Sequence, residues 1–84
     1  MKMELAKAHT VTAEPLGDSG DWIITVDRVQ ILAAYYYRNR SWAISDSRGN
    51  AYNNTYFDGI MELLLWLSRL PDNELQEVLN YGSR

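Results

Sequence analysis

The segment over residues 60–67 constrains the fold most strongly, because Glu62 is its only polar residue. A helix that covers a core with one side normally carries an apolar stripe, whereas this segment is apolar around nearly its whole circumference. Two interpretations follow. The helix is enclosed within one small domain, or its second side meets another copy of the chain or a partner. The residues that we expect in a self-association surface are Met61, Leu65 and Trp66.

The helical pattern around this segment runs from about residue 56 to residue 69. Thr55 and Asp58 have the spacing of a capping box, in which a hydroxyl precedes a carboxylate by three residues. Pro71 predicts the end of the helix, because the residue before a proline is driven out of the helical region.

A second, shorter helix is predicted over residues 73–80, with Asp72 or Asn73 as its cap. Gly82 stands where a helix terminator is expected. The apolar stripe of this helix consists of Leu75, Val78 and Leu79.

Alternating apolar residues in the first half of the chain predict strands rather than helices. The apolar positions change parity twice, which predicts a turn or bulge near residues 27–28 and a turn at residues 38–41. Residues 29–37 also fit a helix capped by Asp27, so both interpretations remain open there. The predicted strands cover residues 10–14, 22–26, 29–37 and 42–46.

Strands followed by helices, without alternation between them, indicate the α+β class. We therefore expect one domain over residues 1–84: a small antiparallel meander of three to four strands, followed by two C-terminal helices packed on one face. The 84 residues are enough for one domain.

Composition argues against catalysis. The chain has no cysteine, and His9 is its only histidine, so we expect no enzyme, no metal and no cofactor. The net charge is −3, and the acidic excess lies within residues 43–84. This balance favours a protein partner over nucleic acid. The start of the chain does not resemble a secretory signal and the apolar runs are short, so we expect a cytoplasmic protein without membrane association.

The densest group of recognition residues lies within residues 35–42. Tyrosine, tryptophan and arginine dominate binding hot spots, because each combines contact area with a polar group. On the strand interpretation the arginines stand at the end of a hairpin. The alternative is that the tyrosines line a sheet face and the arginines are ordinary solvated residues. The residues that we expect to bind a partner here are Tyr36, Arg38, Arg40 and Trp42.

These features predict a non-enzymatic protein-binding module, a small acidic inhibitor or accessory factor that occupies a partner surface. Chains of this style are frequent among phage- and mobile-element-encoded inhibitors of nucleic-acid enzymes, such as CRISPR or restriction effectors, which is an argument from fold analogy alone. Asp72, Glu74 and Glu77 form a second candidate contact surface. The alternative function is a small dimeric nucleic-acid-binding regulator that uses the Tyr/Arg hairpin.

Overall fold

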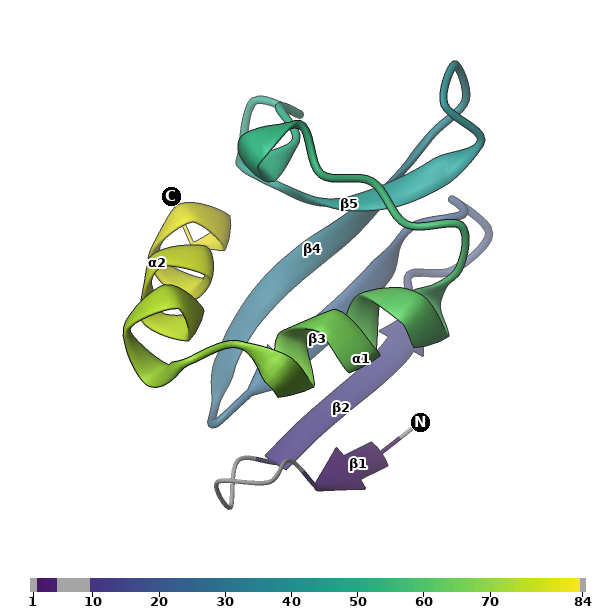
Figure 1. The fold of residues 1–84 in the computed structure, drawn as a ribbon. Coiled ribbons are helices and arrows are strands. Elements are labelled where there is room, and N and C mark those ends of the chain that lie inside the picture. The colour runs from purple at the N-terminus through teal and green to yellow at the C-terminus, as the bar shows by residue number, and fades with distance from the viewer. Residues whose placement is uncertain (1, 5–9, 84) are drawn as a thin grey trace.

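The chain begins with strands and ends with helices, which is the predicted α+β fold (Figure 1). The computed structural model describes residues 2–4 and 10–83, so His9 lies outside the described residues. In the described part of the chain, five strands pair antiparallel in sequence order. The elements are β1 (Lys2–Glu4), β2 (Thr10–Pro15), β3 (Trp22–Val26), β4 (Val29–Tyr36), β5 (Ser41–Ser45), the 3₁₀ turn η1 (Tyr52–Asn54), α1 (Ile60–Arg69) and α2 (Asp72–Gly82).

The sheet confirms the interpretation of residues 29–37 as a strand, and the helical alternative is wrong. Asp27 and Arg28 connect β3 to β4, with φ angles of 47° and 74°. Two successive residues with positive φ make a tight hairpin turn, and this turn explains the first change of parity. The sheet also contains β1, which pairs with β2 and was not expected from the sequence.

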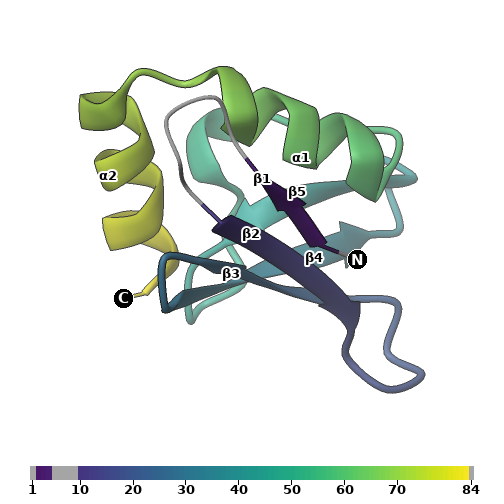
Figure 2. The same cartoon turned by 90° about the horizontal axis from the view of Figure 1, so that it is seen from below.

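Both helices lie on one face of the sheet (Figure 2). α1 crosses over the strands, and α2 packs against one end of β4 and β5 (Figure 1). Burial of a Val, Leu or Ile side chain stabilises a fold by about 1.5–3 kcal/mol, so this interface supplies most of the driving force. The buried apolar side chains at the interface are Val11, Ala13, Ile24, Val26, Ile31, Ala33, Ile44, Ile60, Leu63, Leu64, Leu67, Leu75, Val78 and Leu79.

α1 begins at Ile60 rather than at residue 56, and the predicted capping box is not formed. Thr55 Oγ1 donates instead to the carbonyl of Asn53 at 3.1 Å. Phe57 pairs with Trp42 through two backbone hydrogen bonds of 2.8 Å each. The segment before α1 therefore runs along the edge of β5, and this pairing satisfies backbone groups that a longer helix would have used.

The junction between the helices confirms the role of proline as a stop signal. Leu70 is extended, with φ −73° and ψ 138°, and Pro71 precedes the first residue of α2. Asp72 is therefore the first helical residue, and neither Asp72 nor Asn73 is the cap.

Gly82 is the last residue of α2, not a terminator beyond it. A Cβ atom at this position would lie 2.5 Å from Ile31 Cγ2, so glycine is needed because the helix approaches β4 closely.

α1 is not enclosed within the domain, because one of its sides is exposed. That side carries the charged residues Glu62 and Arg69 as well as apolar ones. Ile60, Leu63, Leu64 and Leu67 are buried against the sheet, whereas Met61 is 48% exposed and Leu65 is 42% exposed. Neither of the two described helices is long and apolar enough to cross a membrane.

Candidate functional site

The sheet divides the group of aromatic and arginine residues over residues 35–42 between its two faces. Tyr35 pairs with Trp42 and Tyr36 pairs with Ser41. Because neighbouring residues of a strand point to opposite faces, Tyr35 and Trp42 lie on the helix side and Tyr36 lies on the outer side. The predicted contact residues therefore do not form one surface. These residues are Tyr36, Arg38, Arg40 and Trp42.

The side chain of Tyr36 makes its contacts with other residues of the same domain. Its hydroxyl donates to the carbonyl of Gly49 at 2.9 Å, and its ring meets that of Tyr56 edge-on with centroids 5.4 Å apart. Partial burial raises the pKa of the Tyr36 hydroxyl above its usual value, although a hydrogen bond with Ser45 opposes that effect. Tyr36 therefore holds the turn after β5 against the outer face of the sheet.

Trp42 links the hydrophobic core, Tyr35 and the loop between β2 and β3, and we call this set of contacts the brace. Its ring packs against the hydrophobic core and lies 4.8 Å from the ring of Tyr35. Its indole Nε1–H donates to the carbonyl of Gly20 at 3.0 Å, and the backbone N–H of Tyr35 donates to Asp21 Oδ1 at 2.8 Å. The loop between β2 and β3 thus fixes the end of β4 and the start of β5.

The hairpin tip, which we define as Tyr37, Arg38 and Arg40, projects beyond this brace. Tyr37 is 78% exposed, and its ring stands edge-on against Tyr35 with centroids 5.0 Å apart. Both arginines are exposed, and their guanidinium groups make no hydrogen bond or ion pair with another residue in the part of the chain that the structure describes. Tyr37 was missed because the strand ends at Tyr36, one residue earlier than predicted.

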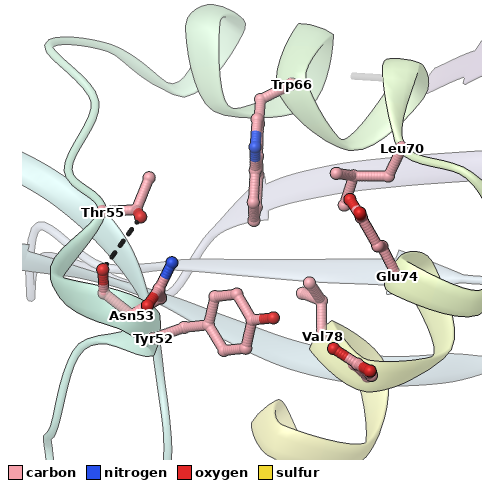
Figure 3. Close-up of a pocket in the computed structure, with 8 residues that line it drawn as sticks. Tyr52, Asn53, Thr55, Trp66, Leu70, Glu74 and Val78 are labelled. Carbon is pink, nitrogen blue, oxygen red and sulfur yellow. Dashed lines mark hydrogen bonds between the residues drawn. The ribbon is translucent and has the colours of Figure 1, made fainter.

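A hollow of about 280 Å³ lies between η1, the end of α1 and the start of α2 (Figure 3). Two of the predicted acidic residues, Glu74 and Glu77, line it, whereas Asp72 does not. The sequence did not predict the hollow, because part of its wall comes from η1, a short element that no sequence pattern indicated. The remaining lining residues are Tyr52, Asn53, Thr55, Trp66, Leu70 and Val78.

The predicted self-association residues also separate. Met61 and Leu65 are exposed on the outside of α1, whereas Trp66 is half-buried and points into the hollow (Figure 3). Met61 and Leu65 remain together as an exposed apolar pair one helical turn apart.

Asp46 organises the turn that follows β5. Its Oδ1 accepts hydrogen bonds from the backbone N–H groups of Asn50 and Arg48, both at 2.9 Å. These bonds, with that from Asn50 the strongest cause, lower the pKa of Asp46 below its usual value. Tyr81 of α2 donates its hydroxyl to the carbonyl of Asn50 at 2.8 Å. The turn and the end of α2 are thereby tied together.

Metal ligands do not gather in residues 2–4 and 10–83: no group of three or more His, Cys, Asp or Glu side chains has a metal-binding arrangement there. No protein-family model matches the chain, and neither a curated protein nor a solved structure has significant similarity to it. The geometry of the hairpin tip and of the hollow is therefore the basis for proposing a function.

Proposed function

We propose that this chain is a non-enzymatic protein-binding module that acts in the cytoplasm by occupying a surface of a larger protein, as a small inhibitor or accessory factor does. The observation that carries the proposal is the 78% exposure of Tyr37, which packs on the braced ring of Tyr35 and is followed by two exposed arginines that have no ion pair with a described residue. The primary contact is the hairpin tip.

The brace matters because binding is weakened by the entropy of ordering side chains. Tyr37 rests on Tyr35, Tyr35 rests on Trp42, and Trp42 is held by its hydrogen bond to Gly20. A ring fixed in this way loses little freedom when a partner covers it. Tyrosine and arginine are also the residue types in which binding energy concentrates.

A protein partner explains the tip better than a nucleic acid does. Stacking on several bases would use adjacent exposed rings, but Tyr35 and Trp42 are half-buried beneath Tyr37. Tracking a phosphate backbone calls for a wide basic surface, whereas the whole chain carries a net charge of −3. The two arginines suit an acidic patch beside an apolar pocket on a protein.

The test is affinity capture from a nuclease-treated lysate of the natural host, with the tagged chain as bait. Arg38→Glu combined with Arg40→Glu should remove the captured protein, because reversing both charges replaces attraction by repulsion. The matched control is Arg28→Glu combined with Arg69→Glu, which changes the net charge equally at exposed positions away from the tip. The control bait should retain the partner.

Fluorescence anisotropy with labelled single-stranded DNA and RNA at low salt tests the alternative function, that of a nucleic-acid-binding regulator. Binding that the tip variant abolishes, with no protein captured, would establish the nucleic-acid regulator and reject our proposal. Equal capture by all three baits would show that the tip is not the contact.

A further inference from the structure

We propose that the hollow between η1, α1 and α2 binds an arginine side chain of a partner protein. This inference rests on the proposed function only in assuming a protein partner, because the hollow is separate from the hairpin tip. It assigns one defined role to Glu74, Glu77 and Trp66, which come from two different helices.

The aromatic wall of the hollow is held rigidly. The ring of Tyr52 lies 5.2 Å from that of Tyr81 and 6.2 Å from that of Trp66, and Trp66 lies 5.1 Å from Phe57. Phe57 is in turn fixed to β5 by its two backbone hydrogen bonds to Trp42. These four rings form a continuous chain, so the wall is in place before a ligand arrives.

The opposite wall supplies negative charge. Glu74 and Glu77 are three residues apart on α2, so they lie on the same side of the helix. Both side chains are exposed, and neither makes a hydrogen bond or ion pair with another described residue. Figure 3 shows the carboxylate of Glu74 beside Leu70, across the hollow from Trp66 and Tyr52.

Polar groups on the aromatic side are also available. The indole N–H of Trp66 and the hydroxyl of Tyr52 make no hydrogen bond with a described residue, and neither atom is buried. The hollow thus combines ring faces, two free carboxylates and hydrogen-bonding groups that can meet the backbone of a peptide.

Charge complementarity selects a cation, and the rings select arginine among cations. A guanidinium group is planar, stacks on aromatic faces and binds carboxylates through paired hydrogen bonds, whereas an ammonium group is a compact, strongly hydrated charge. A hollow of about 280 Å³ is below the usual range for drug-sized ligands, and it suits a single long side chain.

The test uses the peptide acetyl-Ala-Arg-Ala-amide as the probe, followed by ¹⁵N-resolved NMR of the intact chain. We expect saturable shifts of the Trp66 indole resonance and of the amides around Glu74 and Val78, with a Kd on the order of 1 mM. The matched peptide with citrulline, which is a neutral isostere of arginine, should bind at least about tenfold more weakly.

Two protein variants locate the charge. Glu74→Gln combined with Glu77→Gln keeps the side-chain size and should weaken binding of the arginine peptide by about tenfold, because two exposed ion pairs are lost. Glu14→Gln combined with Glu62→Gln makes the same change in net charge at exposed positions outside the hollow. This control should bind the peptide as the parent chain does.

Three results would overturn the proposal. The first is equal binding of the arginine and citrulline peptides, and the second is an unchanged affinity in the Glu74/Glu77 variant. The third is a shift of the same resonances on raising the protein concentration alone, abolished by Arg38→Gln with Arg40→Gln, which would identify a second copy as the occupant. The first two results would leave the role of the hairpin tip to its own capture experiment, whereas the third would assign the tip arginines to the hollow of a second copy.

Discussion

Two groups of packed aromatic rings lie in different parts of the molecule. One group presents an exposed ring beside arginines, and the other lines a hollow beside carboxylates. At the hairpin, Trp42 and Tyr35 support Tyr37, which is exposed to solvent at the start of the turn that carries Arg38 and Arg40. Around the hollow, the rings support one another side by side and face carboxylates. Backbone geometry makes the difference, because the hairpin ends in an exposed turn, whereas the other rings come from η1, the segment before α1, and the two helices. Tyr52 and Trp66 line the hollow, and the rings of Tyr81 and Phe57 pack against them.

The comparison predicts how binding and stability are related in each region. At the tip, the contacting residues are exposed and the bracing residues lie beneath them, so the two properties can be changed separately. Around the hollow, Trp66 packs against the core and also lines the binding surface. Substitutions there should affect both properties together.

The largest expected effect is that of Trp66→Ala. It removes a ring packed against Tyr52 and Phe57 and should lower the free energy of unfolding by about 3 kcal/mol. Urea denaturation measures this change. Met61→Ala on the exposed side of the same helix is the control and should cost well under 1 kcal/mol. Equal losses for the two variants would contradict the account of the aromatic wall.

Gly82→Ala should lower the free energy of unfolding by about 2 kcal/mol, because the new methyl group would overlap Ile31. Asn80→Ala, at an exposed position of α2, should be nearly neutral. Thermal unfolding compares the two variants. Stabilisation by Gly82→Ala, as helix propensity alone predicts, would show that α2 does not approach β4 as closely as described.

Trp42→Phe tests the brace of the tip. It removes the hydrogen bond to Gly20 and should lower the free energy of unfolding by about 1 kcal/mol. The same change should weaken partner binding, because Tyr35 and Tyr37 lose their support. A variant with lower stability and full affinity would show that preorganisation of Tyr37 is unimportant.

The smallest effect concerns the turn that ties α2 to β5. Because the folded state lowers the pKa of Asp46, its contribution to stability is fully present above about pH 4 and is lost as pH falls through the lowered value. Asp46→Asn should therefore differ most from the parent chain near neutral pH and least in acid. Denaturation at a series of pH values measures this difference; a difference that grows in acid would contradict the assignment.

The sequence predicts most of the fold because local patterns determine it. Alternation locates the strands β2 to β5, and the apolar stripe of Leu75, Val78 and Leu79 locates α2. β1 was missed because three residues are too short for a period. The start of α1 was misplaced because Phe57 pairs with Trp42, a contact between distant residues that no local pattern contains.

The candidate sites were predicted less well, for two physical reasons. The strand β4 ends one residue earlier than predicted, so the exposed tyrosine is Tyr37, whereas Tyr36 is hydrogen-bonded within the fold. Alternation of apolar residues does not locate the end of a strand to within one residue. The hollow depends on Asn53 and Asn54, which both adopt positive φ and turn the chain beside α2. The sequence identified Glu74 and Glu77 as contact residues and Trp66 as a self-association residue, but it did not predict that these side chains line one hollow with Tyr52.

We propose that Tyr37 binds a partner while it contributes little to the stability of the fold. The most direct test is the dissociation constant of the captured partner for the parent chain and for Tyr37→Ala, with urea denaturation of both. We expect the affinity to fall by at least about thirtyfold, as for a hot-spot residue, and the free energy of unfolding to change by less than about 0.5 kcal/mol. Unchanged affinity, or a loss of affinity explained by unfolding of the variant, would contradict the claim.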